Sequence, residues 1–511
     1  MPTLHRYEVL SSIPGSLKPL LAIGKNLWWS WNEGARALFS RIDPALYERV
    51  AQNPLALLTL APQARLDELS RDTAYLEALA KVGAELDAYL TRDTWFSTTH
   101  AKTPLAGARI GYFSMEFGIH EALPVYSGGL GVLAGDHLKS ASDLGVPVVG
   151  VGVAFSQGYF RQSLDPEGLQ HERYPHNDWH DLPVTAVTAP DGARVRVAVT
   201  LPVIGSAPAI TRAVALEAWR VDVGRVPLFL LDANLPDNAP EDRALTNTLY
   251  GGDRNHRIRQ EILLGVGGVR LLDAVSLRPT VCHMNEGHSA FLAMERVRQL
   301  MSDHGASFAV AAEAASAGNV FTTHTPVPAG NDAFAADLIA PYLPVLGAGL
   351  GLSEQETMQL GRADPAVTQG GEFSMPVLAI RMADRRNGVS ELHGREARAM
   401  WRILWPHLPE HEVPIGSITN GVHFGTWIDP EIEVAYRRWL GEDWEARAAD
   451  PATWAKINEV PDAEIWAVRE RCRARLVAEI PHRIRALAER QGFPVDPRVG
   501  PGLDPHALTI G

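Results

Sequence analysis

Residues 145–155, Gly-Val-Pro-Val-Val-Gly-Val-Gly-Val-Ala-Phe, form an almost unbroken apolar run. Strands of a parallel sheet are covered by helices on both faces, so they are apolar throughout rather than alternating. Four similar short runs occur along the chain, at 110–113, 226–232, 280–284 and 320–323. Because longer amphipathic stretches separate them, the sequence predicts an α/β domain with a largely parallel sheet.

Two of these amphipathic stretches are well defined. Residues 254–272 and 289–301 carry apolar side chains at intervals of three and four, which predicts helices. Gly265, Gly267 and Gly268 fall inside the first of them. A glycine cluster can form a ligand-binding loop, but the surrounding pattern favours close packing of a helix at these glycines.

The chain has a different character on either side of this region. Residues 1 to about 95 are predicted to be helical, with a Trp-rich stretch at 26–31, and Thr103-Pro104 marks a boundary. Residues 182–219 are rich in Val and Thr and alternate in polarity, which predicts an antiparallel hairpin insertion. Residues 430–491 are highly charged and are predicted to be helical again.

Composition narrows the class of protein. The 511 residues are 46% hydrophobic and 21% charged, which is typical of a soluble globular protein of two or three domains. A net charge of −13 without a basic stripe argues against nucleic acids and anionic membranes as partners, and is compatible with a neutral polysaccharide or a small molecule. Two cysteines, no signal-peptide pattern and an apolar run too short to span a bilayer predict a cytoplasmic protein.

A glycine-rich turn is the first candidate binding element. Gly128-Gly129-Leu130-Gly131 precedes a helix that is predicted to start near Val132. Glycines let a backbone approach a ligand closely, and the amides of a helix N-terminus suit an anion. The same spacing also fits a plain strand-to-helix turn, so spacing alone leaves both interpretations open.

Polar clusters follow two of the predicted strands. His283, Glu286 and His288 come after one strand and His324 after the next, at the carboxyl ends where open α/β sheets place their binding residues. The spacing His283-x-x-Glu286-x-His288 differs from that of a helical zinc motif, so a polar pocket wall is favoured over a metal site. An imidazole such as that of His324, or an amide such as that of Asn420, is suited to sugar hydroxyls, although a lone histidine is often structural.

Taken together, these segments resemble the α-glucan phosphorylases, that is, the glycogen, starch and maltodextrin phosphorylase family. The resemblance covers residues 105 to 440, and the Trp-rich residues 26–31 are similar to the helical segment of the bacterial branch. Eight blocks occur in the family's order: 112–117, 128–131, 226–234, 249–253, 285–288, 323–325, 387–389 with 393–394, and 419–421.

The resemblance implies a fold and a reaction. Members of the family have two Rossmann-like domains of the GT-B type facing each other across a cleft. They move the terminal glucose of an α-1,4-glucan onto inorganic phosphate, giving glucose 1-phosphate with retained configuration. Pyridoxal phosphate, bound to a lysine of the second domain, acts through its phosphate group. The partners are therefore the glucan and phosphate, and a homo-oligomer is possible.

The family's motifs also imply roles for particular residues. The backbone amides from Gly128 to Gly131 would cradle the phosphate side of the site, with Gly129 near the cofactor phosphate, and Leu130 would border the glucose ring. His324 would be catalytic, binding the glucose and stabilising the developing oxocarbenium charge through its backbone carbonyl. Asn420 would bind another hydroxyl.

The remaining implied site residues are acidic or lie beside acidic residues. Asp253 would lie in a loop that covers the sugar, and Glu116 would be a carboxylate of the cleft wall. Glu286 and His288 match an aspartate and a histidine that line the same cleft, so Glu286 is a conservative departure.

The sequence departs from the family at its lysines. None of the six lysines lies in the family's Lys-x-Ser-Gly-Thr-Gly cofactor motif. Lys139, after the glycine turn, is predicted to be a solvated lysine on a helix surface. We therefore expect residues 1–100 to be a helical segment, 105–440 the N-terminal Rossmann-like domain and 441–511 a helical bridge toward a second domain that is missing. The chain alone is expected to be inactive.

Two alternatives remain open at this stage. A nucleotide-sugar-dependent glucan synthase has the same two-domain architecture, but its Gly-Gly-Leu loop follows shortly after a lysine, whereas Tyr126-Ser127 stand here. A non-catalytic remnant that binds glucan or another protein would also lack the cofactor lysine. DNA that continues downstream of codon 511 into the cofactor motif would decide between the remnant and the enzyme.

Overall fold

The computed structural model describes residues 10–165, 167–206, 210–327, 330–363, 371–491 and 503–508. It divides into two compact units. The first comprises residues 1–161 and 172–423, and the second comprises 162–171 and 424–511. None of the described helices is long and apolar enough to cross a membrane.

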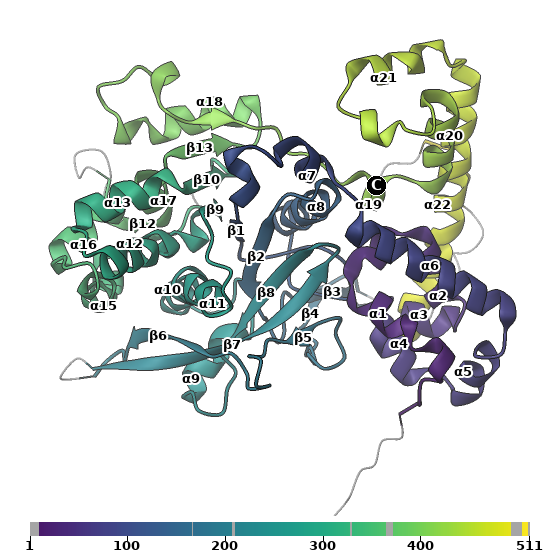
Figure 1. Cartoon of the computed structure of the whole chain (residues 1–511), viewed down its shortest axis with the longest axis horizontal. Coiled ribbons are helices and arrows are strands. Elements are labelled where there is room, and N and C mark those ends of the chain that lie inside the picture. Colours follow the sequence, from purple (N-terminus) through teal and green to yellow (C-terminus); the bar gives the residue numbers. More distant parts are fainter. Residues whose placement is uncertain are drawn as a thin grey trace, which may run out of the picture. The chain divides into compact units, whose positions relative to one another are not determined.

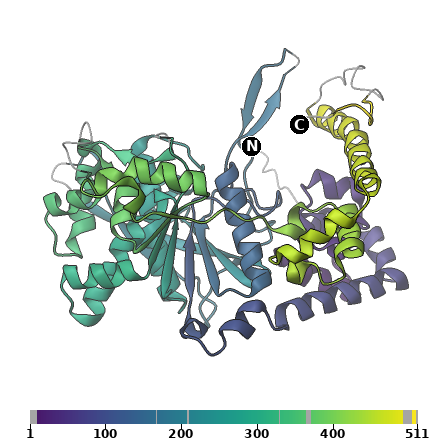
Figure 2. The same ribbon diagram turned by 90° about the horizontal axis from the view of Figure 1, so that it is seen from above.

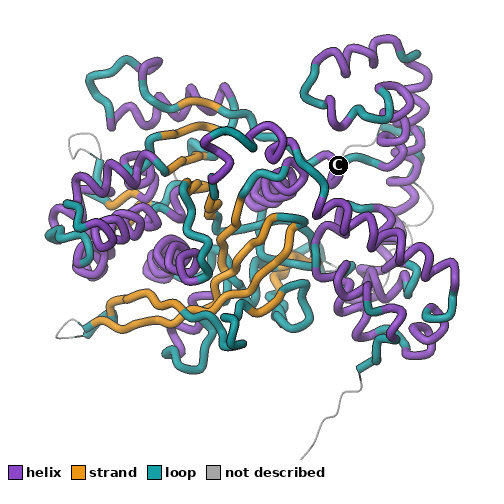
Figure 3. The backbone as a smooth tube through the Cα atoms, in the orientation of Figure 1, coloured by secondary structure: helices purple, strands orange, loops and turns teal. Residues whose placement is uncertain are grey.

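A ten-stranded sheet forms the centre of the first unit within the described part of the chain (Figures 1 and 3). Its strand order is β14-β13-β10-β9-β1-β2-β8-β7-β5, with β6 paired to β7. All pairs from β14 to β8 are parallel, and β7 pairs antiparallel to β8. The bounds are β1 Ile110–Phe113, β2 Val148–Val153, β5 Thr185–Ala186, β6 Val197–Pro202, β7 Thr211–Val223, β8 Val226–Asp232, β9 Val281–Asn285, β10 Asn319–Thr323, β13 Arg385–Gly388 and β14 Gly416–Ser417.

The five apolar runs of the sequence are therefore confirmed as the neighbouring parallel strands β10, β9, β1, β2 and β8. The expected antiparallel hairpin is present as β6 and β7. The hairpin is not only an insertion, as its alternating polarity predicted. Residues Glu217 to Val223 of β7 also pair with β8, so the hairpin extends the main sheet.

Helices cover both faces of this sheet (Figures 1 and 2). Neighbouring residues of a strand point to opposite faces. Gly150 of β2 faces Leu138 of α8, while Val151 faces Gly268 of α11, so the two helices pack on opposite sides. The helices around the sheet are α8 Gly129–Leu144, α9 Pro240–Arg243, α10 Arg254–Ile262, α11 Gly268–Ala274, α12 Phe291–His304, α13 Phe308–Ala317, α14 Ala336–Ile339, α15 Leu343–Ala348, α16 Glu354–Gly361, α17 Met375–Arg381 and α18 Glu391–Trp401; a short strand pair, β11 Ala333–Phe334 and β12 Phe373–Ser374, lies beside them.

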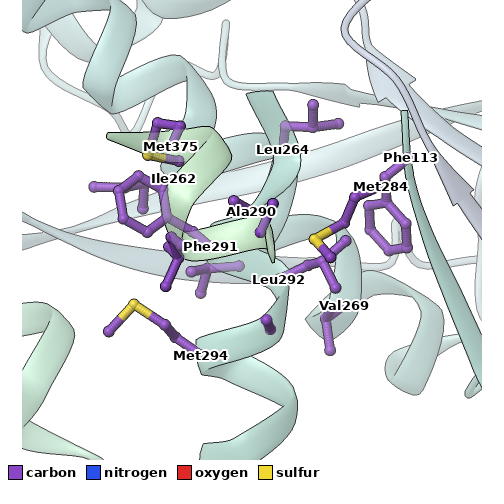
Figure 4. Packing of buried hydrophobic residues seen from close by; sticks show 14 of the residues in the cluster. Phe113, Ile262, Leu264, Val269, Met284, Ala290, Phe291, Leu292, Met294 and Met375 are labelled. Atoms are coloured by element: carbon purple, nitrogen blue, oxygen red, sulfur yellow. The ribbon is translucent and has the colours of Figure 1, made fainter. Parts of the chain in front are cut away.

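The cluster of Gly265, Gly267 and Gly268 is confirmed as helical, in a π turn over Leu263–Gly267 and the start of α11. A Cβ atom on Gly265 would lie 2.7 Å from the backbone nitrogen of Leu292. The glycines therefore let this segment pack closely against α12. Figure 4 shows the apolar core at this point, with Phe113 and Met284 from the sheet near Leu292 and Val269, and Phe291 near Ile262.

The N-terminal helices pack on the α8 side of the sheet. Their apolar residues, including Trp29 and Tyr75, share one buried cluster with Leu138 of α8 and with Leu228 and Leu230 of β8. The bounds are α1 Pro19–Lys25, α2 Glu33–Ser40, α3 Pro44–Arg49, α4 Pro54–Leu60, α5 Gln63–Leu69, α6 Thr73–Thr91 and α7 Trp95–His100.

The second unit is mainly helical. It contains α19 Phe424–Trp427, α20 Pro430–Leu440, α21 Pro451–Ala455 and α22 Asp462–Gln491, together with most of the hairpin β3 Arg161–Leu164 and β4 Gln170–Arg173. Trp444 is buried there against the rings of Phe424, Tyr436 and Trp454, at 5.4, 5.3 and 6.0 Å between ring centroids. The helices predicted between 430 and 491 are thus present.

Candidate functional site

A cavity of about 520 Å³ opens at the carboxyl ends of β9 and β10. The two strands are parallel neighbours with Asn285 opposite Thr322, so the loops that follow them meet at one edge. One such loop brings Glu286 and His288 into the wall and the other brings His324. The cavity is lined by Leu130, Tyr250, Gly251, Gly252, Asp253, Arg254, Arg257, Glu286, His288, His324, Thr325, Gly330 and Asp332.

Five of the predicted site residues thus line one cavity: Leu130, Asp253, Glu286, His288 and His324. Asn420 is not among the lining residues. Its backbone N–H donates to the carbonyl of Val389 at 3.0 Å, and the residue is exposed. His283 is not among the lining residues, and its Nε2 lies 2.8 Å from the hydroxyl of Thr322.

Glu116 lies behind the wall, because its carboxylate is used within the protein. Its Oε2 accepts hydrogen bonds from the backbone amides of Ser127 at 2.7 Å and Gly128 at 3.1 Å. Its Oε1 accepts the phenolic O–H of Tyr250 at 2.8 Å. The buried carboxylate therefore joins the glycine turn to the loop that contains Asp253.

The glycine turn becomes the first turn of α8, with Gly128 as the N-cap. The predicted cradle consists of the amides from Gly128 to Gly131. The amide of Gly128 is already bonded to Glu116, so the amides from Gly129 to Gly131 remain available for an anion, because first-turn amides have no acceptor within their own helix. A Cβ atom on Gly131 would lie 2.7 Å from Glu116 Oε2, whereas a Cβ on Gly129 would meet nothing within 4 Å. Gly131 is thus required for the close approach of Glu116.

Glu286 combines backbone strain with a buried acid. Its φ angle is 69°, a region that residues other than glycine rarely adopt and that occurs at functional sites. Its Oε2 accepts the backbone N–H of His324 at 2.7 Å, while Oε1 is buried without a partner among the described residues. Burial raises the pKa of the Glu286 carboxyl to about 8, so the acid is mostly protonated at neutral pH.

His324 is held as a neutral ring. Its Nε2 lies 2.6 Å from Asn285 Oδ1. Burial is the main cause that lowers the pKa of His324 to about 4, with a smaller contribution from His393. The imidazole can therefore exchange hydrogen bonds with a hydroxyl at neutral pH without carrying charge.

Charged groups also line the cavity, among them Arg257 and Asp332. Arg257 Nε lies 3.1 Å from Asp332 Oδ2 and 3.2 Å from Glu261 Oε1. Burial, and next the charge of the Asp332 carboxylate, raise the pKa of the Glu261 carboxyl well above its usual range. His288 Nε2 lies 3.6 Å from the same Asp332 oxygen, and burial lowers its pKa to about 3. Arg257 and Asp332 thus line the cavity as an ion pair, while Glu261 is fully buried and does not line it.

Several lining residues were not among the predicted site residues, including Tyr250, Arg257 and Asp332. One signal was available: Arg257 and Glu261 are four residues apart on the apolar side of a predicted helix, where charged residues need a partner. Asp253, which was predicted, also caps α10, since its Oδ1 accepts the amide of His256 at 2.7 Å.

The lysines do not fit the anchor of a pyridoxal phosphate at this cavity. None of the six is a lining residue, and five are exposed. The prediction that Lys139 is a solvated surface lysine is wrong: it is 1% exposed. Its Nζ donates to the carbonyl of Ile119 at 2.8 Å and lies 5.6 Å from the Trp31 ring, because the N-terminal helices cover this side of α8.

No group of three or more His, Cys, Asp or Glu side chains that could hold a metal ion is found in the described ranges of the chain. His283 does not line the cavity with Glu286 and His288, and its Nε2 contacts the hydroxyl of Thr322 instead. Of this motif, Glu286 and His288 both line the cavity, as a polar pocket wall requires, and the choice between a wall and a metal site stays a prediction.

Comparison with known proteins gives the family. Residues 13–123 match a family model described as a protein of unknown function, DUF3417. The chain is 43% identical over 528 aligned residues to a glycogen phosphorylase of Mycobacterium tuberculosis, covering 100% of this chain and 59% of that protein. A maltodextrin phosphorylase of Thermococcus litoralis is 38% identical, over 99% of this chain and 58% of its own length.

A glycogen phosphorylase of Aquifex aeolicus is 31% identical over 496 residues, covering 96% of this chain and 68% of that protein. The chain thus spans a little less than three fifths of the length of the first two relatives and about two thirds of the third. The identity extends through the N-terminal helices as well as the sheet, since nearly the whole chain is matched in each case. The chain belongs to the glycogen phosphorylase family.

Proposed function

We propose that this chain forms the sugar-binding part of an α-1,4-glucan phosphorylase, an enzyme that transfers the terminal glucose of glycogen or maltodextrin to inorganic phosphate and releases glucose 1-phosphate. The proposed architecture is the N-terminal Rossmann-like half of a GT-B enzyme, preceded by the helices of residues 1–100. The parallel sheet with helices on both faces and the family membership support this proposal.

One observation carries the proposal. The cavity at the carboxyl edge of the sheet is lined by hydrogen-bonding groups held neutral by burial, among them His324 and Glu286, together with two arginines and two aspartates. Its volume of about 520 Å³ is in the range of small-molecule sites. A neutral sugar needs fixed donors and acceptors at its hydroxyls, and His324 and protonated Glu286 are such groups.

We assign the roles accordingly. His324 contacts the glucose and acts in catalysis, its backbone carbonyl facing the positive charge that develops on the sugar. Leu130, Asp253, Glu286 and His288 form the sugar-binding wall. The helix amides from Gly129 to Gly131 suit an anion such as the substrate phosphate.

Two further residues act from outside the wall. Glu116 holds the glycine turn in place, which its hydrogen bonds to Ser127 and Gly128 support. Asn420 contributes from outside the lining of this cavity. Phosphorolysis brings anionic groups together, so fixed amide donors lower the energy of the charged transition state.

The proposal extends to the cofactor, the cellular location and the partners. Because no lysine of these residues fits as its anchor, we propose that pyridoxal phosphate is not bound through a lysine of this chain. A cytoplasmic location without nucleic-acid or membrane partners is in keeping with the net charge of −13.

The test is glucose 1-phosphate release by the complete gene product, incubated with maltodextrin and inorganic phosphate. Substitution of His324 by alanine should lower kcat/KM by about a hundredfold or more, since one fixed donor or acceptor at developing charge contributes that much. The matched control is His407→Ala, an exposed histidine that is not among the lining residues, which should retain wild-type activity. Equal activity of the two variants, or no phosphate-dependent product from the wild type, would reject the proposal.

A further inference from the structure

A chain of four hydrogen-bonded polar groups runs from the segment after β1 to the catalytic candidate His324. Ser114 Oγ lies 2.9 Å from the carbonyl oxygen of Glu116. Asn285 Nδ2 lies 3.1 Å from Ser114 Oγ, and Asn285 Oδ1 lies 2.6 Å from His324 Nε2. Ser114 and Asn285 are 0% and 1% exposed.

The direction of each hydrogen bond follows from its neighbour. A carbonyl oxygen can only accept, so the hydroxyl proton of Ser114 points to Glu116. Ser114 Oγ must then accept from Asn285, which places the amide NH₂ toward Ser114. Asn285 therefore presents its carbonyl oxygen to His324, and that oxygen too can only accept. The proton of the His324 ring must lie on Nε2.

The reverse orientation of the asparagine is disfavoured. If its amide were flipped, NH₂ would face His324, and Ser114 would have to donate to Asn285. The buried carbonyl of Glu116 would then lose the donor that Ser114 provides. Leaving a buried carbonyl unsatisfied disfavours that state by about tenfold to a hundredfold.

We propose that Asn285 is a positioning residue that fixes His324 as the Nε2–H tautomer and so leaves Nδ1 as a hydrogen-bond acceptor on the cavity side. No hydrogen-bond partner of Nδ1 is found in the described part of the chain, and His324 lines the cavity. Nδ1 then selects a ligand group that donates a hydrogen bond, such as a hydroxyl. This last consequence rests on the proposed function, whereas the tautomer itself does not.

The test observes the ring directly in the 511-residue chain without ligand. The chain is labelled with ¹⁵N-histidine, and the His324 signals are assigned from the spectrum of His324→Gln. At neutral pH we expect a slowly exchanging ring proton that is coupled to Nε2, with an unprotonated Nδ1. Asn285→Leu has a similar volume but no acceptor, so the slowly exchanging proton should be lost. Asn387→Leu is the control on neighbouring β13, since Asn387 accepts from Thr322 and not from His324.

Two further variants keep the test decisive if Asn285→Leu does not fold. Asn285→Asp is nearly isosteric and places a carboxylate at 2.6 Å from Nε2, so His324 should become doubly protonated at neutral pH. Ser114→Ala removes the group that orients the amide and should populate the Nδ1–H tautomer measurably. A wild-type ring protonated on Nδ1, or a slowly exchanging Nε2–H that survives in Asn285→Leu, would overturn the proposal. Because no turnover is measured, its failure is distinct from failure of the proposed function.

Discussion

At the scale of single residues, Glu286 shows that the cavity wall holds an acid in an unusual state. The side chain is 2% exposed, and its φ angle of 69° is one that residues other than glycine rarely adopt. Such strain persists only where the surrounding structure holds it, here through the bond from the His324 amide. The strain and the raised pKa together mark this residue as part of the site.

The raised pKa predicts how stability varies with pH. Between pH 4.5 and 8 the folded protein keeps the Glu286 proton, while the unfolded chain releases it. The contribution of this group is therefore fully present below pH 4.5 and is lost as pH rises toward 8. Glu286→Gln has no such proton, so the stability of the wild type relative to this variant should fall across that range, by up to about 5 kcal/mol.

Urea unfolding of both proteins at pH 5 and pH 8 measures this difference. The control is Glu313→Gln on α13, where the side chain is exposed and the two pH values should give the same difference from the wild type. If the stability of the wild type relative to Glu286→Gln rises with pH, or is the same at both pH values, the acid is ionised in the folded protein.

At the scale of elements, the start of α8 is held by one carboxylate. Gly131→Ala places a Cβ atom 2.7 Å from Glu116 Oε2 and 2.7 Å from Tyr126 Cβ, so the carboxylate must leave the amides of Ser127 and Gly128. Overpacking of this kind costs about 1–3 kcal/mol. Gly129→Ala in the same turn meets nothing within 4 Å and should be neutral or slightly stabilising.

Thermal unfolding of the two variants tests the difference, and sugar binding to the chain gives a second measure. Gly131→Ala should lower both the melting temperature and the affinity for the sugar, because Glu116 also holds Tyr250 of the cavity wall. Equal melting temperatures for Gly131→Ala and Gly129→Ala would mean that the Glu116 contact does not constrain the turn.

The elements also show which features a sequence can predict. Strands β1, β2, β8, β9 and β10 were visible because burial on both faces leaves a local apolar pattern. The helical position of Gly265 could be predicted because the apolar residues around it recur at helical spacing, which is again a local pattern. Glu286 and His324 were found because they directly follow strands, where parallel sheets place their sites.

The features that were missed depend on contacts between distant parts of the chain. Glu116 and Tyr250 are 134 residues apart, and Arg257 and Asp332 are 75 apart. The periodic pattern of apolar residues along a helix or strand carries no information about such distant pairs. Lys139 was misjudged for the same reason, since its helix appears amphipathic until the Trp-rich helices cover its polar side. A family resemblance supplied the remaining roles, and it names residues without giving their partners.

At the scale of the whole molecule, several histidines are buried as neutral rings. Burial is the first cause in each case, and it lowers the pKa of His120 and His324 to about 4 and that of His283 and His288 to about 3. They occur in different parts of the first unit. His120 lies against Trp29 of the N-terminal helices, 4.6 Å between ring centroids, whereas His283 lies within the sheet.

These rings predict that the protein loses stability in mild acid. Below pH 6.5 the unfolded chain protonates its histidines while the folded protein does not, so each ring's contribution is fully present above pH 6.5 and is lost as pH falls. At pH 5 the loss is about 2 kcal/mol per ring, or about 8 kcal/mol for four. Protonated Glu286 opposes this by about 2 kcal/mol over the same interval, so the histidines dominate.

Urea unfolding at pH 6.5 and pH 5 should show this loss of stability. The variant His283→Gln should reduce the loss by about 2 kcal/mol, whereas His407→Gln, at an exposed histidine, should leave it unchanged. An unfolding free energy that is equal at the two pH values would mean that the buried rings accept protons without unfolding, and that the two cores and the cavity are open to water.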